Sequence, residues 1–209
     1  MNSSNTHICT WFYAESEGEE SYYPQVGGLS SSSKFQAVYL RCVAVFFATS
    51  LRVNPAAQHT IYTNLSALPK IGAIDINALL RSWEVEIVTI PLSYLTPPDY
   101  HNEWRNQFYI FDILQHISQN CTDDDNYILL DSDCVWLRSA SRIVDDLNAY
   151  GLLTYDLTCC GTKRSNSTLQ SLYSDLSQSP MTEDVIYYGG EWFAAKGCEL
   201  KKVSAAFPT

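Results

Sequence analysis

Two aspartates separated by one serine follow a short apolar run in the second half of the chain. The run covers residues 127–130, and the acids are Asp131 and Asp133. If the run is a buried strand, its end holds both carboxylates in fixed directions. Two carboxylates, completed by phosphate oxygens and water, suit Mg²⁺ or Mn²⁺, because these hard cations take few protein ligands. Asp and Ser are also common in solvated turns, so the neighbouring elements must decide between a metal site and a turn.

A second segment with catalytic residue types is the run YYGGEWF at residues 187–193. Its paired glycines, Gly189 and Gly190, let the backbone approach a ligand closely. Glu191 is a candidate general base, or a group that orients a hydroxyl. Trp192 is a candidate for stacking on a sugar ring, although a β-bulge with a buried tryptophan explains the same residues. Asp184, near the start of this segment, is a weaker catalytic candidate.

The elements that must position these acids alternate between strands and helices. Hydrophobic patterning predicts strands at 7–13, 59–63, 85–90, 127–130 and 151–155, and a strand or hairpin at 184–195. It predicts helices at 34–51, 75–81, 104–118 and 142–147, with another starting within 198–207. Residues 15–33 and 161–181 are expected to be long polar loops. Such alternation predicts an α/β fold with a mostly parallel sheet, in which ligands bind beyond the carboxyl ends of the strands.

Composition narrows the classes of protein that fit. The 209 residues are 46% hydrophobic and 17% charged, which predicts one globular domain over residues 1–209. The net charge of −10, with no basic stripe visible in the sequence, argues against a nucleic-acid partner. The seven cysteines contain no CxxC pair and are expected to be reduced thiols. The sequence shows neither a signal peptide nor an apolar run long enough for a transmembrane segment, so we expect a cytoplasmic protein.

One family whose motif overlaps the two aspartates is the haloacid dehalogenase-like phosphatases. An apolar strand followed by DxDx[TV] is typical of that superfamily, and the residues from Asp131 to Val135 fit it. Asp131 would then be the nucleophile and Asp133 the acid/base. The position of the motif argues against this interpretation, because it normally lies near the N-terminus and is followed by further motifs.

The order of features along about residues 7–200 resembles the GT-A fold glycosyltransferases. The first strand ends in aromatic residues, a later one ends in Thr63-Asn64, and a helix that carries Arg105 precedes the DxD strand. The paired-glycine segment follows some fifty residues later. The arrangement is similar to metal-dependent enzymes that use UDP-sugars. It implies a Rossmann-like fold, sugar transfer from a nucleotide-sugar to an unidentified acceptor, and Mn²⁺ or Mg²⁺ as cofactor.

The resemblance also implies roles for individual residues. Asp133 would contact the metal, and Asp131 would bind the metal or the hydroxyls of the donor. The remaining donor-side residues are Thr10, Phe12 and Tyr13 near the base, Asn64 near the base or ribose, Arg105 near the phosphates, and Asp112 near the sugar. The acceptor side would be formed by Gly189, Gly190 and Trp192, with Glu191 and Asp184 as the catalytic candidates.

The resemblance is incomplete at the C-terminal end of the sequence. Many members of the superfamily carry a further metal-contacting or acceptor-binding segment, often with a histidine, whereas no histidine follows His116 here. We therefore expect either a minimal or truncated core, or a third metal ligand that is water or phosphate. A non-catalytic domain that binds nucleotide-sugar remains an alternative, and the sequence leaves open whether transfer retains or inverts the anomeric configuration.

Overall fold

The computed structural model describes residues 5–18, 20, 28–95, 105–157, 166–183 and 185–207, and for Arg105, Asn166 and Leu176 the backbone only. Its six strands form one sheet in the order β3-β2-β1-β4-β6-β5. The strands are β1 (Thr6–Phe12), β2 (Gln58–Thr63), β3 (Glu86–Thr89), β4 (Asn126–Leu130), β5 (Leu152–Asp156) and β6 (Tyr188–Lys196). The first four pair in parallel, and β6 runs antiparallel to both of its neighbours. The predicted mostly parallel α/β sheet is confirmed.

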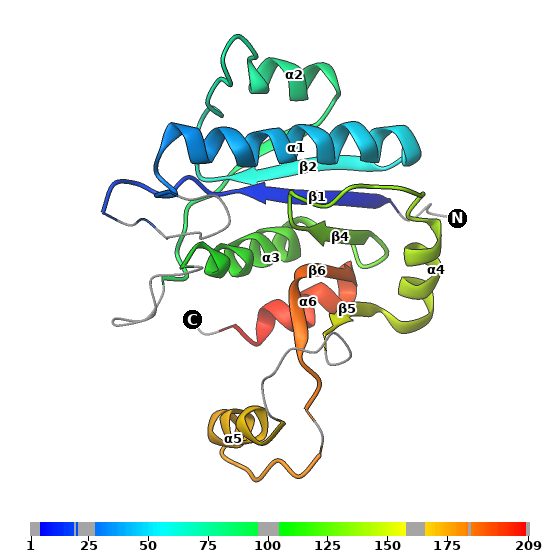
Figure 1. Cartoon of the computed structure of the whole chain (residues 1–209). Helices are drawn as coiled ribbons and strands as arrows, with labels where there is room; N and C mark the ends of the chain where they lie inside the picture. The colour runs from blue at the N-terminus through cyan, green and yellow to red at the C-terminus, as the bar shows by residue number, and fades with distance from the viewer. Residues whose placement is uncertain are drawn as a thin grey trace.

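Helices cover both faces of this sheet (Figure 1). They are α1 (Ser33–Val53), α2 (Ile76–Ser82), η1 (Arg105–Phe108), α3 (Tyr109–Asn120), α4 (Ser141–Tyr150), α5 (Asn166–Ser177) and α6 (Gly197–Ala205). One apolar core lies between the sheet and α1, α2 and α4. A second core lies between the sheet and α3 and α6, on the opposite face. The result is a three-layer α/β/α sandwich.

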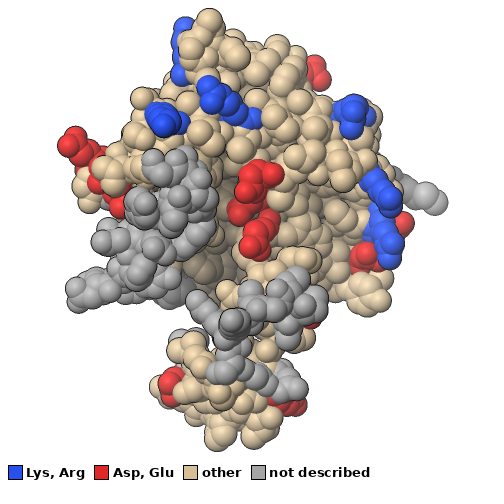
Figure 2. Space-filling view, viewed as in Figure 1, with Lys and Arg blue, Asp and Glu red and all other residues tan. Residues whose placement is uncertain are grey.

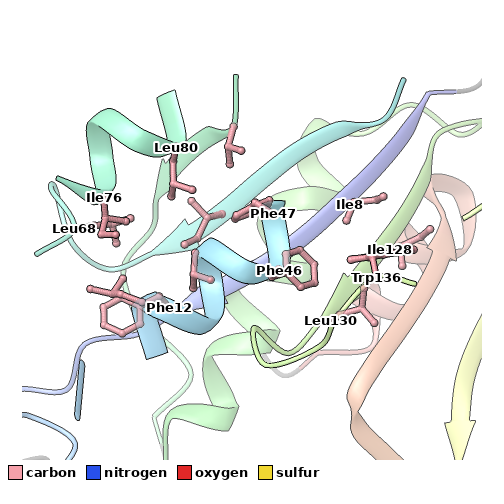
Figure 3. Close-up of a cluster of buried hydrophobic side chains, with 14 of the residues drawn as sticks. Ile8, Phe12, Phe46, Phe47, Leu68, Ile76, Leu80, Ile128, Leu130 and Trp136 are labelled. Atoms are coloured by element: carbon pink, nitrogen blue, oxygen red, sulfur yellow. The ribbon is translucent and has the colours of Figure 1, made fainter. Parts of the chain in front are cut away.

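Helix α1 is the main support of the first core. The hydroxyl of Ser32 caps its first turn by accepting a hydrogen bond from the amide of Phe35 at 3.3 Å. Phe46 and Phe47 are fully buried and point from α1 into the cluster formed with the strands (Figure 3). Burying each ring contributes roughly 2–3 kcal/mol to folding. The core therefore fixes the orientation of α1 against the carboxyl ends of the central strands.

The length and composition of α1 also match those of a membrane span. Its most apolar 18-residue stretch has a mean hydropathy of 1.3, and 28% of that stretch is buried against the rest of the fold. The sequence analysis predicted a helix here but no possible membrane span, because Arg41 and Arg52 interrupt the apolar residues. In the described structure α1 lies along the sheet as a core helix (Figure 1).

Most predicted elements lie within a few residues of their observed positions, and one region differs. Helix α5 lies within the span that was expected to be a polar loop, 161–181. It stands apart from the sheet, beyond the ends of β5 and β6 (Figure 1). Leu169 is its one described residue with a buried side chain, so its sequence lacks the strong apolar period that marks a core helix. This explains why its sequence did not predict a helix.

Candidate active site

A cleft of about 220 Å³ opens where the carboxyl ends of β1 and β4 meet β6 and the first turns of α1. This is the edge at which parallel α/β sheets bind ligands. Thirteen of the described residues line the cleft: Trp11, Phe12, Tyr13, Ser30, Phe35, Gln36, Tyr39, Asn106, Gln107, Asp131, Ser132, Asp133 and Glu191. Figure 2 shows acidic side chains gathered in the middle of the face it presents. Among these described lining residues there is no Lys or Arg.

Three acids converge on the cleft from two strands. Asp131 follows the last residue of β4, and its backbone amide donates to the carbonyl of Glu191 at 3.0 Å. This bond continues the antiparallel register that pairs Leu130 with Trp192. Asp131 and Glu191 are therefore cross-strand neighbours, and such neighbours project to the same side of a sheet. Asp133 lies two residues beyond Asp131 and is exposed.

A break in the β5–β6 ladder accompanies this arrangement. Thr154 pairs with Phe193, but the next residue, Tyr155, pairs with Gly189. Residues 190–192 are therefore extra on the β6 side and bulge out of the ladder with β5. The bulge contains Glu191, which lines the cleft. The sequence analysis offered a β-bulge and a functional Glu191 as two explanations of residues 187–193. The structure has the bulge, and Glu191 lies within it and lines the cleft.

Burial and acidic charges raise the pKa values of three side chains in and beside the cleft. Burial, followed by the charges of Asp133 and Glu191, raises the pKa of Asp131 to about 7. Burial, followed by the charges of Asp133 and Asp131, raises the pKa of the Tyr39 phenol to about 12. Burial and the three acids raise the pKa of the Cys134 thiol to about 11. The cleft therefore concentrates negative potential that a bound cation would relieve.

Aromatic side chains line much of the rest of the cleft. Trp11, Phe12 and Tyr13 come from the end of β1. Phe35 and Tyr39 come from the first two turns of α1, and their rings stack with centroids 4.8 Å apart. Flat aromatic surfaces of this kind suit the face of a base or a sugar ring. Amide groups of Gln36, Asn106 and Gln107 complete the lining and supply hydrogen-bond donors and acceptors.

Five of the residues predicted from the sequence come together in this cleft: Phe12, Tyr13, Asp131, Asp133 and Glu191. Thr10 does not join them. Its side chain is fully buried in β1, on the face that carries Ile8 and Phe12. The expectation that Thr10 faces a bound base is corrected, because a completely buried side chain cannot contact a ligand in the cleft.

Asn64 and Asp112 are engaged in structural hydrogen bonds instead of lining the cleft. The amide side chain of Asn64 accepts from the backbone of Ala14 at 2.8 Å and donates to it at 2.9 Å, which ties the chain after β1 to the end of β2. The buried carboxylate of Asp112 accepts from the backbone amides of Ser93 and Tyr94 and from the Ser93 hydroxyl. Both predictions of donor contact are corrected, because these polar atoms already have partners in the fold.

The residues predicted for the acceptor side, Gly189, Gly190 and Trp192, are not part of the cleft lining either. Trp192 packs against the core cluster beneath α1 and is not part of the cleft lining. Gly189 is also outside the lining, but it matters to Glu191. A Cβ atom at this position would overlap the Glu191 carboxylate and lie 2.9 Å from Leu157 Cδ1. The lack of a side chain at Gly189 therefore leaves room for Glu191, whereas Gly190 has only Gln107 within 4 Å.

Two predicted residues cannot be placed. Asp184 lies outside the described residues, and of Arg105 only the backbone, in η1, is described. The sequence analysis did not single out eight residues of the lining for a role in the cleft: Trp11, Ser30, Phe35, Gln36, Tyr39, Asn106, Gln107 and Ser132. The aromatic spacing of Phe35 and Tyr39 at the start of an amphipathic helix was the signal available for two of them.

The donor atoms at this site fit a hard divalent cation in part. Asp131 and Asp133 supply carboxylate oxygens, and the raised pKa of Asp131 shows that its negative charge lacks compensation. Within the described residues, no group of three or more His, Cys, Asp or Glu side chains is arranged as a complete metal site. Two carboxylates plus phosphate oxygens and water is the usual arrangement for Mg²⁺ in nucleotide sites. The residues therefore fit a cation that is shared with a diphosphate.

Solved structures with the same architecture were found, although no protein-family model and no curated protein matches the sequence. The galactosyltransferase LgtC, in complex with donor and acceptor sugar analogs, superimposes with a TM-score of 0.51 at 12% identity, over 94% of this chain and 59% of LgtC. An active-site mutant of LgtC gives a TM-score of 0.54 with the same identity and coverage. Mouse xyloside xylosyltransferase 1 gives 0.50 at 9% identity, over 97% of this chain and 71% of that enzyme.

The fold is that of the GT-A glycosyltransferases. The chain spans about 59% of the length of LgtC. Asp131 follows the fourth strand in the order of the sheet, next to the antiparallel strand β6. In this GT-A core the DxD residues occupy the ligand-binding edge of the sheet.

Proposed function

We propose that this chain is the core of a glycosyltransferase that moves a sugar from a nucleotide-sugar, with a UDP-sugar as the leading candidate, to a hydroxyl-bearing acceptor. The observation that carries the proposal is the convergence of Asp131, Asp133 and Glu191 on one side of an aromatic cleft in a GT-A fold. The relatives in structure are galactosyl- and xylosyltransferases, which supports sugar transfer as the reaction class. The low sequence identity leaves donor and acceptor to experiment.

The donor would lie with its base against aromatic side chains of the cleft. Tyr13 at the end of β1 is one candidate for stacking, and the Phe35–Tyr39 pair is a second. The amides of Asn106 and Gln107 are placed to hydrogen bond the ribose or sugar hydroxyls. Oriented binding of this kind lowers the entropic cost of bringing donor and acceptor together.

Asp131 and Asp133 would hold Mn²⁺ or Mg²⁺ together with the donor diphosphate. A cation bound there supplies Lewis-acid stabilisation of the diphosphate charge as the sugar departs. No basic side chain lines the described cleft, so this compensation has no substitute among the described lining residues. The proposal therefore requires a strict dependence of nucleotide binding on divalent cation.

Glu191, which lines the cleft, would receive the acceptor proton. In transfer, the bond from the anomeric carbon to the phosphate oxygen breaks, and a bond from that carbon to the acceptor oxygen forms. The proton of the acceptor hydroxyl must leave, and the carboxylate of Glu191 would take it as general base if the configuration inverts. If the configuration is retained, Glu191 would instead orient the acceptor or the sugar. Both roles place its carboxylate at the sugar end of the cleft.

The test is a transfer assay with a panel of UDP-sugars and simple sugar acceptors, in Mn²⁺ and in EDTA. Native chain is expected to release UDP faster from one donor, only with cation, and Asp133→Asn is expected to lose this activity. UDP binding without transfer or donor hydrolysis would instead support the non-catalytic alternative. A chain that neither binds nor turns over any nucleotide-sugar would contradict the proposal.

A further inference from the structure

Helix α1 presents a row of basic side chains to solvent. Its most exposed positions after the first residue are Lys34, Arg41, Val45, Ala48 and Arg52. Spacings of seven, four, three and four residues place them on one side of a helix, opposite the buried phenylalanines. No acidic residue occurs anywhere in α1. The outer side of this helix is therefore positively charged and apolar, in a protein whose net charge is −10.

The segment after the DxD residues lies beside the same helix. The amide of Trp136 donates to the Thr49 hydroxyl at 3.2 Å, and the amide of Ala140 donates to Asn54 Oδ1 at 2.6 Å. The ring of Trp136 also packs against Phe46. Residues 136–140 are thus held along the last turns of α1, and they carry Arg138 between the two attachments.

These elements together form one basic surface, made of Lys34, Arg41, Arg52, Arg138 and Arg142. All five side chains are exposed, and none forms an ion pair or hydrogen bond within the described part of the chain. The segment 134–144 contains no acid, and the first acids after it are Asp145 and Asp146 in α4. Figure 2 shows blue side chains over α1 and, toward the edge of the view, over the α4 region. The sequence did not reveal this surface because its residues are far apart along the chain.

Aliphatic side chains project from the same surface. Leu137 is 79% exposed, Val135 is 53% exposed and Val45 is 49% exposed. An open groove of about 560 Å³ runs beside them, lined mainly by apolar residues and by Arg138. Exposed aliphatic groups beside unpaired cations are the composition of a surface that meets lipid headgroups and acyl chains.

We propose that this basic surface docks on an anionic lipid bilayer. Charge complementarity favours an anionic partner, since each cation lacks a partner within the described chain. The protruding Leu137 and Val135 favour lipid over a nucleic acid, whose phosphate backbone would leave them in water, and the apolar composition of α1 favours lipid over an acidic protein. The surface begins at Cys134, next to Asp133, so docking would hold the mouth of the cleft close to the membrane. This inference goes beyond the proposed function and does not depend on it.

Vesicle co-sedimentation of the native chain tests the proposal. The vesicles are phosphatidylcholine alone, or phosphatidylcholine and phosphatidylglycerol in equal parts, each at low and high salt. Native chain is expected to sediment with the anionic vesicles at low salt and to be released by high salt. Each arginine near a charged bilayer changes the partition coefficient by about five-fold, so Arg52→Gln/Arg138→Gln/Arg142→Gln should reduce it by about 100-fold.

The control removes charge from the opposite face of the sheet. Lys201→Gln/Lys202→Gln alters two residues of α6 and should leave vesicle binding within about two-fold of native. Leu137→Ser should weaken binding by about five-fold without changing the circular dichroism spectrum. Equal losses per charge removed in the arginine variant and the lysine control, or no binding to anionic vesicles, would overturn the proposal. Binding to poly-glutamate or duplex DNA but not to vesicles would overturn it in favour of an acidic macromolecule.

Discussion

The amide of Asp131 donates to the carbonyl of Glu191 at 3.0 Å, which makes these two acids cross-strand neighbours between the end of β4 and β6. Like charges that face each other across two strands destabilise a sheet. Burial, followed by the charges of Asp133 and of the paired Glu191, raises the pKa of Asp131 to about 7. The fold thus holds an unfavourable charge arrangement at the edge where its ligands are expected to bind, and the first two predictions follow from it.

Replacing Asp131 by asparagine is expected to stabilise the metal-free protein at alkaline pH. Its pKa in the folded state, about 7, exceeds the ordinary value of an aspartate. Between these values the folded state binds a proton that the unfolded state does not, so native stability falls as pH rises toward 7. Asp131→Asn cannot ionise and should be more stable than native by about 1–3 kcal/mol near pH 8, and nearly equal near pH 5.

Urea unfolding in EDTA at both pH values measures this difference. Asp124→Asn is the control, because it removes one negative charge from an exposed turn. If Asp131→Asn changes the free energy of unfolding by the same amount at both pH values, the pKa of Asp131 is not raised in the folded state.

Cation-dependent nucleotide binding is expected to release a proton from Asp131. A carboxylate must be ionised to hold a cation, so affinity for UDP with Mn²⁺ should increase with pH up to about 7 and then level off. The slope below that point should approach tenfold per pH unit. Calorimetry in two buffers of different ionisation enthalpy counts the protons released. An affinity that is the same on both sides of neutrality would exclude Asp131 from the binding equilibrium.

Gly189 is expected to control the position of Glu191. A Cβ atom there would overlap the end of the Glu191 side chain and crowd Leu157. Both are movable side chains, so Gly189→Ala should cost little stability but displace the carboxylate, lowering the rate of transfer by about 10²-fold. Gly190→Ala is the matched control, because its Cβ would meet only Gln107 Oε1, at 3.7 Å. Equal rates in the two variants would argue against a role for the Glu191 carboxylate.

Asp112 is expected to contribute to stability instead of to donor binding. Its carboxylate accepts two backbone amides and one hydroxyl from residues 93–94. Asp112→Ala leaves these donors without their partner and should cost about 2–3 kcal/mol of unfolding free energy. Asp112 does not line the cleft. The affinity of the folded fraction for UDP with Mn²⁺ should therefore stay within about two-fold of native, which is a change in binding free energy of less than about 0.5 kcal/mol. Lost affinity with unchanged stability would restore the direct sugar contact that the sequence suggested.

The sequence predicted those parts of the fold that are determined by local patterns. The buried run before Asp131 is β4, and the long apolar stretch from residue 34 is α1. The resemblance to GT-A enzymes also placed Phe12, Tyr13, Asp133 and Glu191 in one site, and the cleft contains all four. These residues follow strand ends or paired glycines, which are signals that a single sequence carries.

Features that depend on pairing between distant segments could not be predicted. The antiparallel direction of β6 and the shift of its register against β5 bring Glu191 opposite Asp131, and neither has a local signal. The side chains of Asn64 and Asp112 form hydrogen bonds to backbone groups 50 and 18–19 residues away. A polar residue near a strand end therefore looks the same in the sequence whether it binds a ligand or closes a loop.

The most direct test of the account is calorimetric titration of UDP into the native chain and into Asp133→Ala, with Mn²⁺ and with EDTA. Asp133 is exposed, so this variant should keep the native fold, which circular dichroism would verify. The account predicts binding to the native chain only with Mn²⁺, and at least a 100-fold loss of affinity in Asp133→Ala, as expected when one ligand of a shared cation is removed. Binding that is equally tight in EDTA, or unchanged in Asp133→Ala, would contradict a cation-bridged nucleotide site at the end of β4.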